Sequence, residues 1–224
     1  MSERENILAR IREALVIPAP KPVLKDKAVA EPLEDGYAAF LPAAGNTFEA
    51  QQKQFKLNAV DLKADFHLLE DASEAAVTLA KIRDSEGWKK IATHRGALTL
   101  AVCDALGLAP LIVDDTFDKN ALETCDAGIT ECDALVAQTG SVLVTSRSAG
   151  GRALSVLPPH HIVLARRDQM VPDLPAAFAL VKRKYGADFP SMISFITGPS
   201  RTGDIERILV LGAHGPKKLT ILCY

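Results

Sequence analysis

The sequence predicts an α/β protein, a Rossmann-like layered domain built around a mixed sheet. Helix-like and strand-like segments alternate between residues 47 and 113, a pattern typical of parallel β–α–β units. Two apolar runs, 134–137 and 142–145, flank a glycine-containing connection and predict an antiparallel hairpin. Polar loops follow several apolar segments, as ligand-binding loops follow strands in open α/β sheets.

In the first half of the domain, helices and strands are expected to alternate strictly. Its elements are a helix over 47–60, a strand over 66–69, a helix capped by Ser73 and ending at Gly87, a strand over 88–93, a helix closed by Gly107 and a strand over 111–113. The helix before Gly107 has the clearest apolar stripe, made of Ala97, Leu98, Ala101, Val102, Ala105 and Leu106.

The second half is expected to mix strand directions. After the hairpin come a polar loop, a strand over 162–165, a helix capped by Asp173 and stopped by Gly186, a strand over 192–196, a second polar loop and a last strand over 219–223. Together the two halves predict helices packed on a mixed sheet.

Residues 1–45 are expected to form an N-terminal helix and a proline-rich arm, and residues 46–224 a single α/β domain. Ser2 and Glu5 have the spacing of a capping box. Apolar residues recur behind them at helical period: Ile7, Leu8, Ile11, Ala14 and Leu15. Five prolines then follow between residues 18 and 42, which disfavours packed secondary structure there.

Composition argues against several classes of partner. The net charge of −2 lacks the basic excess of a nucleic-acid-binding domain. The charged N-terminus lacks the apolar core of a signal peptide, and the uncharged run 134–146 is too short to span a bilayer. We therefore expect a soluble, cytoplasmic protein with no nucleic-acid partner and no membrane span.

The cysteines do not predict a metal or iron–sulfur site. Cys103, Cys125, Cys132 and Cys223 form no C-x-x-C pair, and no histidine lies at the spacing of a metal finger. The adjacent pair His160 and His161 would point to opposite faces of a strand, so a shared ion is disfavoured. We expect four reduced cysteines, no metal and no cofactor on this chain.

Candidate chemistry lies in three polar loops, over 138–141, 146–152 and 197–206. In the last, Gly198, Ser200, Arg201 and Thr202 place backbone amides, hydroxyls and a guanidinium on one turn, which suits a phosphate or carboxylate. Asp204 and Glu206 follow, either to hold Arg201 or to act as a general base. A turn whose hydroxyls cap their own backbone would have the same composition.

The two other loops and one histidine complete the set of candidates. Further candidates for anion binding are Thr139, Gly140 and Ser141 in the first loop and Arg147 in the glycine-rich second loop. Neither a Walker A loop nor a G-x-G-x-x-G fingerprint is present. His214 lies between Gly212 and Gly215, where close backbone approach and proton transfer are both feasible, although a structural hydrogen bond is the commoner role.

Four motifs resemble the LUD-domain family, specifically its lactate-utilization protein C type. They are Gln138-Thr-Gly-Ser141, Leu157-Pro-Pro-His-His-Ile162, Thr197-Gly-Pro-Ser-Arg-Thr-Gly-Asp-Ile-Glu206 and Gly212-Ala-His-Gly-Pro216. The similarity is strongest from about Ala127 to the C-terminus. The family often has an acidic residue where this chain has Gln138, so the resemblance assigns no catalytic base to that position.

The resemblance implies a fold and a role. The fold is expected to resemble ribose-phosphate isomerase, glucosamine-phosphate deaminase, the CoA-transferases and formyltetrahydrofolate cyclo-ligase. The implied role is that of a non-redox subunit in the bacterial oxidation of L-lactate to pyruvate, together with two companion proteins that carry iron–sulfur clusters. In this interpretation Arg201 would clamp the carboxylate of a small ligand, and His214 would carry a proton.

Two other functions fit the same residues. One is a stand-alone enzyme that acts on a phosphorylated, CoA or folate-like substrate, as the wider fold group suggests. The other is a non-catalytic scaffold that binds the companion proteins through the N-terminal helix and arm.

Overall fold

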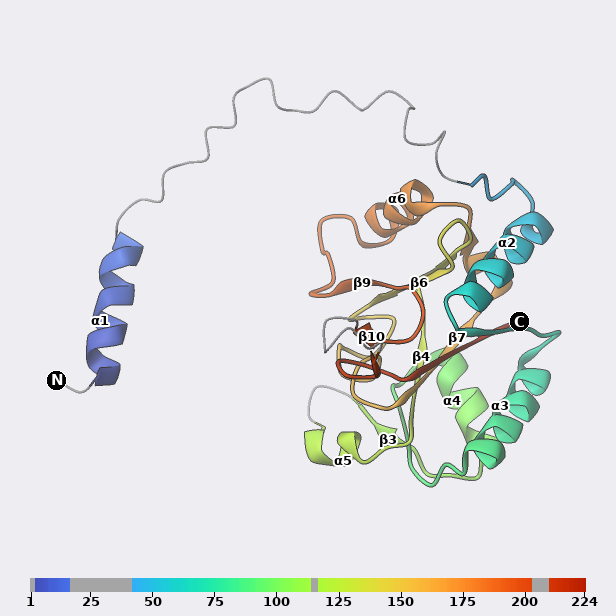
Figure 1. Ribbon diagram of the computed structural model, residues 1–224, viewed down its shortest axis with the longest axis horizontal. Coiled ribbons are helices and arrows are strands. Elements are labelled where there is room, and N and C mark those ends of the chain that lie inside the picture. The colour runs from blue at the N-terminus through green and yellow to red at the C-terminus, as the bar shows by residue number, and fades with distance from the viewer. Residues whose placement is uncertain (1–2, 17–41, 114–116, 203–209) are drawn as a thin grey trace, which may run out of the picture. The chain divides into compact units, whose positions relative to one another are not determined.

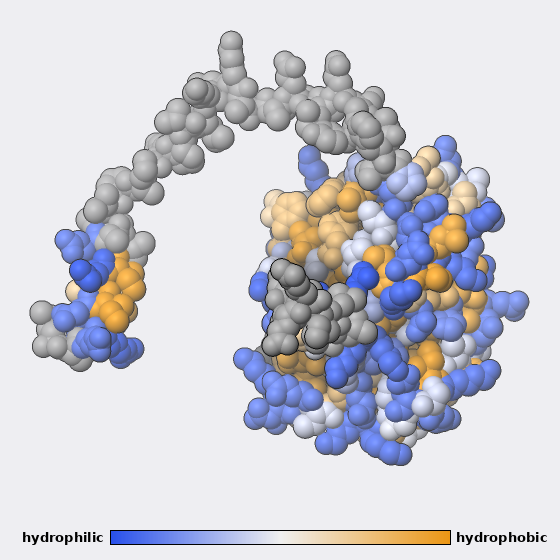
Figure 2. All heavy atoms as spheres, viewed as in Figure 1, coloured by the Kyte–Doolittle hydropathy of each residue, from blue (hydrophilic) through white to orange (hydrophobic). Residues whose placement is uncertain are grey.

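The computed structural model describes residues 3–16, 42–113, 117–202 and 210–224 (Figure 1). The chain divides into two units, Met1–Pro42 and Ala43–Tyr224. In the first unit the described element is helix α1 (Glu3–Val16). Its apolar residues Ile7, Leu8 and Ile11 are exposed, and Figure 2 shows apolar residues gathered on one side of this helix.

The second unit is an α/β domain. Its elements in chain order are α2 (Phe48–Asp61), β1 (Asp65–Leu68), α3 (Ala72–Glu86), β2 (Ile91–Thr93), α4 (Ala97–Asp104), β3 (Leu111–Ile112), α5 (Lys119–Glu123), β4 (Ala127–Glu131), β5 (Ala134–Val136), β6 (Ser141–Thr145), β7 (His160–Ala165), a 3-10 turn (Arg167–Gln169), β8 (Met170–Val171), α6 (Leu174–Tyr185), β9 (Ile193–Ile196), β10 (Arg201–Thr202), β11 (Val210–Leu211) and β12 (Lys218–Cys223).

Six strands form an all-parallel sheet in the order β1-β12-β7-β4-β2-β3. Its centre is β7, whose residues are all buried. Helices α3 and α4 cover one face, where Leu79 and Val102 pack with Ile162 and Leu164. A strand with both faces covered reads as a continuous apolar run, and the Ile-Val-Leu-Ala run of β7 does so.

The opposite face of the parallel sheet is covered by α2 and by a second sheet. That sheet has the order β8-β5-β6-β9, with β5–β6 and β6–β9 antiparallel. Phe55 of α2 and Val142 of β6 pack with Val163 of β7 in this core. Helix α6 packs against the outer side of the second sheet, where Val181 lies with Leu143. The domain therefore has four layers: helices, parallel sheet, second sheet, and helix α6.

The predicted α/β fold class and most predicted elements are confirmed. Helix α2 is capped by Thr47, helix α6 is capped by Asp173, and β5 and β6 form the expected hairpin. The parallel and antiparallel pairings are divided between two stacked sheets. Strand β4 was not predicted, because its sequence, Ala-Gly-Ile-Thr-Glu, contains one large apolar residue.

One predicted helix cap is wrong. Asp71, not Ser73, is the N-cap of α3, and its carboxylate accepts a hydrogen bond of 2.9 Å from the backbone N of Glu74. A carboxylate at this position also interacts favourably with the positive end of the helix dipole, so Asp71 is the better cap. The helix ends as expected at Gly87, which is left-handed.

The structure also corrects the placement of the three polar loops. The loop 138–141 joins β5 to β6, the loop 146–152 follows β6, and Thr197 follows β9. All three begin at strands of the second sheet, so none of them directly follows the carboxyl end of a parallel strand. Within the described residues no helix is long and apolar enough to cross a membrane.

Candidate functional site

A pocket of about 230 Å³ lies where the loop after β9 meets the turn before β12. Its lining residues, which we call the histidine pocket, are Ser155, Val156, His161, Ile196, Thr197, Gly198, Pro199, Ser200, His214, Gly215, Pro216 and Leu219. His161 and Leu219 are the second residues of β7 and β12, so the pocket lies near the amino ends of these parallel strands. Three sequence candidates, Gly198, Ser200 and His214, meet here.

His161 is the most deeply buried polar residue of this pocket. Its side chain has no solvent exposure, and its Nε2 lies 2.9 Å from the hydroxyl oxygen of Thr130 on β4. Its Nδ1 is buried and makes no hydrogen bond to any described residue. Burial lowers the pKa of His161 to about 3, with a further lowering from His160, so the ring is neutral at physiological pH. A neutral ring whose second nitrogen is unsatisfied suits a polar ligand atom.

The expected divergence of the two adjacent histidines is confirmed. His160 Nε2 lies 2.9 Å from the hydroxyl of Thr220, and its ring meets Trp88 edge-on at 5.2 Å between ring centroids. His161 faces the opposite side of β7 and lines the histidine pocket. The two rings cannot share one ion.

The first and third polar loops meet beside the pocket. The hydroxyls of Ser141 and Thr197 lie 2.8 Å apart, and Ser141 also donates to Thr139 over 2.8 Å. The register explains this contact, because Val142 at the start of β6 pairs with Ile196 at the end of β9. Ser141 is buried, so this hydroxyl chain fixes the two loops to each other.

Helix α2 supports both loops from the other side. The side-chain amide of Asn58 donates to the backbone oxygens of Ala137 and Gln138, over 2.8 and 2.9 Å. Gly198 has a φ of +81°, and a Cβ at this position would lie 2.7 Å from the backbone oxygen of Leu62. Because that neighbour is backbone and cannot rotate away, position 198 requires glycine.

The two family-like motifs of the C-terminal part are held together by backbone hydrogen bonds. Ser200 N donates to Pro216 O, and Gly212 N donates to Ser200 O, each over 2.9 Å. His214 is exposed and Ser200 half-buried, and both line the pocket. The arrangement places an imidazole and a hydroxyl at the mouth and the buried ring of His161 in the wall.

Arg201 and Thr202 form strand β10, which pairs with Val210 and Leu211 of β11. Arg201 is exposed and is not a lining residue of the histidine pocket. The candidates Asp204 and Glu206 lie outside the described residues.

Arg147, a further candidate for anion binding, does not line the histidine pocket. Its guanidinium lies 2.5 Å from the carboxylate of Asp188 and 5.5 Å from the ring centroid of Tyr185. Strand β6 separates it from the histidine pocket, because Ser141 begins this strand and Arg147 follows its end. Five strand residues span roughly 17 Å, so Arg147 and Ser141 serve opposite ends of the second sheet.

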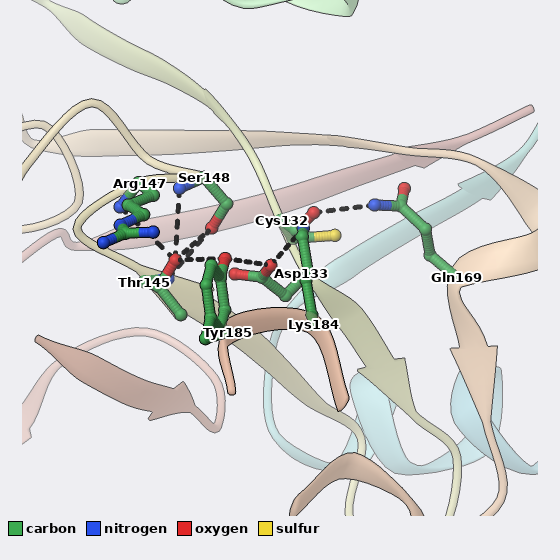
Figure 3. Close-up of polar contacts among 8 residues, drawn as sticks. All are labelled: Cys132, Asp133, Thr145, Arg147, Ser148, Gln169, Lys184 and Tyr185. Atoms are coloured by element: carbon green, nitrogen blue, oxygen red, sulfur yellow. Dashed lines mark hydrogen bonds and ion pairs between the residues drawn. The ribbon is translucent and has the colours of Figure 1, made fainter. Parts of the chain in front are cut away.

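A buried polar network surrounds the end of β6 (Figure 3). The side chain of Asp133 has no solvent exposure and accepts from Lys184 Nζ over 2.5 Å and from Tyr185 Oη over 2.6 Å. Tyr185 Oη also lies 3.0 Å from the hydroxyl of Thr145. Burial alone would raise the pKa of Asp133, but hydrogen bonds, led by that of Lys184, outweigh it and lower this pKa. Asp133 is therefore charged, and the network fastens α6 to the second sheet.

The described cysteines and acidic residues offer no metal centre. Within the described ranges, no group of three or more His, Cys, Asp or Glu side chains is placed to hold a metal ion. All four cysteines are free and buried, and burial raises the pKa of Cys103 and of Cys223 to about 11. These two thiols are protonated at neutral pH and are poor metal ligands.

Fold and site together define a layered α/β domain in which two loops close over one buried histidine. The sequence profile of the LUD domain matches residues 52–224. The chain therefore belongs to the LUD-domain family.

Several relatives match the chain over part of their length. Lactate utilization protein C of Geobacillus kaustophilus is 40% identical over 101 residues, which cover 44% of this chain and 42% of the relative. The protein of the same name from Bacillus licheniformis is 38% identical over 98 residues, covering 43% and 41%. These alignments span less than half of those relatives. An uncharacterized protein of Neisseria meningitidis serogroup B is 26% identical over 229 residues, covering 99% of this chain and 93% of the relative.

A solved structure supports the fold. The crystal structure of a DUF162 family protein from Deinococcus radiodurans superposes with a TM-score of 0.62 at 22% sequence identity, covering 80% of this chain and 99% of the other. At this identity the likeness concerns the fold alone.

Proposed function

We propose that this chain serves bacterial lactate utilization as a cytoplasmic subunit without a redox centre of its own, acting with iron–sulfur companion proteins. Support comes from the family, from the name of the partial relatives, and from four buried free cysteines that form no cluster. Oxidation of lactate to pyruvate releases two electrons, so a subunit without a redox centre would leave electron transfer to its iron–sulfur partners, which is the division of labour proposed here.

The histidine pocket is proposed to bind the small carboxylate of this system. The observation that carries the proposal is that two family-like motifs, through Ser200 and His214, line one pocket together with His161, whose buried Nδ1 has no hydrogen-bond partner. A volume of about 230 Å³ is below the range of pockets for drug-sized ligands, about 300–1,000 Å³, and suits a smaller molecule.

Hydrogen bonding supplies the selectivity. If the Thr130 hydroxyl donates to His161 Nε2, then Nδ1 carries the ring hydrogen and is a buried donor for a carboxylate or carbonyl oxygen. The Ser200 hydroxyl is a second donor, and His214 at the mouth is the proposed proton carrier. Arg201, beside Ser200 in the chain, is proposed to attract the carboxylate from outside the pocket.

Deleting the gene in its source organism is expected to abolish growth on L-lactate as sole carbon source, provided that no second copy is present. Wild type should restore growth, whereas Ser200→Ala and His214→Ala should not, because both remove polar groups from the pocket. His67→Ala, in β1, is the matched control for His214→Ala and should restore growth. Undiminished growth of the deletion strain would contradict the proposal.

A further inference from the structure

Strand β9 is an edge of the second sheet, and its outer side has no partner strand. Within the described residues this sheet has the order β8-β5-β6-β9, so β9 pairs with β6 alone. Ser146 N donates to Met192 O, and hydrogen-bonded pairs alternate with non-bonded pairs along an antiparallel ladder. By this alternation Ser194 also bonds to β6, whereas Ile193 and Phe195 direct their N–H and C=O groups away from it. These four backbone groups face a further strand.

The other edges of the two larger sheets carry the protection that is usual for edge strands. Strand β1 begins with Asp65, β3 has two residues and directly follows Pro110, and β8 has two residues and directly precedes Pro172. Charged residues, prolines and short length keep an edge from pairing with another chain. Strand β9 has four residues, and neither a charged residue nor a proline occurs over 191–198. Among these four edges, β9 is therefore the one that lacks protection.

Apolar side chains flank this edge on the face that carries α6. The rings of Phe195 on β9 and Phe178 on α6 lie 5.2 Å apart between centroids. Phe178 and Phe189 are each more than half exposed, and Ile193 is exposed as well. Figure 2 shows apolar residues gathered over α6 and the segment that leads into β9. The surface that covers this edge is expected to be apolar and uncharged.

A second copy of β9 has the required chemistry and the required pattern. When two copies run antiparallel about a two-fold axis at Ser194, Ile193 of each copy lies opposite Phe195 of the other. Both residues direct their backbone groups outward, so the two pairs form four hydrogen bonds. On the face toward α6 each pair joins a β-branched and an aromatic side chain, which stabilises antiparallel strands. On the inner face Met192 meets Ile196, and no like charges meet because the paired segment has no charge.

We propose that the chain forms a two-fold symmetric homodimer in which the two β9 strands pair and join the second sheets into one. Pairing about a two-fold axis consumes both unprotected edges at once, so assembly stops at the dimer. The exposed rings of Phe178 and Phe189 lie beside the new strand pair and supply apolar area to the same interface. The proposal rests on the strand edge and not on any ligand of the histidine pocket, so it does not depend on the lactate role.

Analytical ultracentrifugation of the full chain over a series of protein concentrations tests the dimer. Wild type is expected to sediment with the mass of two chains. Ile193→Lys should raise the dissociation constant of the dimer about tenfold or more, because it places a charge against the apolar Phe195 of the other copy. Val60→Lys, which replaces an exposed valine on α2, is the matched control and should dimerise like wild type. Both replaced side chains are exposed, so circular dichroism should show an unchanged fold.

A cysteine cross-link tests the register of the pair. Ser194 would lie opposite its own copy in a non-bonded pair, whose Cα atoms are about 4.5 Å apart, within the disulfide range of about 4.4–6.8 Å. The four native cysteines are buried. Mild oxidation should therefore cross-link the Ser194→Cys variant into a dimer. Ser191→Cys is the control and should not cross-link, because residue 191 would lie opposite residue 197.

Three results would each overturn the proposal. They are a wild type that stays monomeric at every concentration, a dimer that persists unweakened in Ile193→Lys, and equal cross-linking of the Ser194→Cys and Ser191→Cys variants. A failure to bind L-lactate would contradict the proposed function and leave this result unaffected.

Discussion

Lowering the pH from 7 to 5 is expected to reduce the unfolding free energy of the domain by about 4 kcal/mol through two buried histidines alone. Burial lowers the pKa of His160 to about 4 and that of His161 to about 3, from an ordinary value of 6.5. At pH 5 each ring is therefore neutral in the folded protein and protonated in the unfolded chain. Each contributes about 2 kcal/mol, because one pKa unit corresponds to about 1.4 kcal/mol.

The direction of this effect follows from proton uptake. Between the folded and unfolded pKa values the unfolded chain binds more protons, so stability falls as the pH falls. The contribution is complete above pH 6.5 and is lost progressively toward pH 3 to 4. Neither ring has an acidic side chain as its hydrogen-bond partner; both face threonine hydroxyls.

Urea denaturation of wild type and of the double variant His160→Gln/His161→Asn, at pH 7 and pH 5, measures this contribution. Carboxylates contribute equally to both proteins and cancel in the difference. The variant is expected to be less stable at pH 7, because its hydrogen bonds to the threonines are altered, but to lose about 4 kcal/mol less than wild type on acidification. Equal losses in the two proteins would show that the histidines do not remain neutral in the fold.

The second large effect is expected from Lys184→Met, which should destabilise the domain by about 2 kcal/mol. Removing one partner of a fully buried ion pair costs about 3–5 kcal/mol, and the half-exposed side chain of Lys184 reduces that figure. Asp133 would keep its hydrogen bond from Tyr185 but would lose its balancing charge inside the domain. Methionine keeps most of the apolar stem of the lysine, so the change is mainly electrostatic.

Chemical denaturation of single and double variants isolates the pair. Lys182→Met changes an exposed lysine in the same helical turn and should have little effect. In an Asp133→Asn background, where no buried charge remains, Lys184→Met should cost much less than in wild type. An equal cost in both backgrounds would mean that the lysine acts only through its packing.

Elements with a strong local signal could be predicted from the sequence. The predicted cap Asp173 accepts a hydrogen bond from its own helix, and the predicted hairpin has its turn residue, Gly140, in the left-handed conformation. Strand β4 could not be recognised, because Ala127 and Gly128 carry no strand signal. Gly128 is small because Leu154 O lies only 2.4 Å from the place of its missing Cβ, a tertiary reason.

The candidate site could likewise be predicted only in part, because it depends on tertiary contacts. Ser200 and His214 lie in recognisable motifs, and both do line the histidine pocket. His161 looked structural, since nothing local indicates that its Nδ1 lacks a partner. The contact of Ser141 with Thr197 and that of Asp133 with Lys184 join residues more than fifty positions apart. Arg147 and Arg152 also find their partners on a distant segment. Arg147 donates to the carboxylate of Asp188, and Arg152 donates to the backbone oxygen of Ser191.

The most direct test of the proposed carboxylate site is calorimetric titration of the purified chain with L-lactate and with pyruvate. The account predicts saturable one-to-one binding to wild type of at least one of them. Affinity should fall about tenfold or more in Ser200→Ala, which removes a donor to a charged oxygen. It should be unchanged in Arg152→Ala, because Arg152 does not line the histidine pocket. No saturable binding of either acid, or equal affinity in wild type and Ser200→Ala, would contradict the assignment of the histidine pocket.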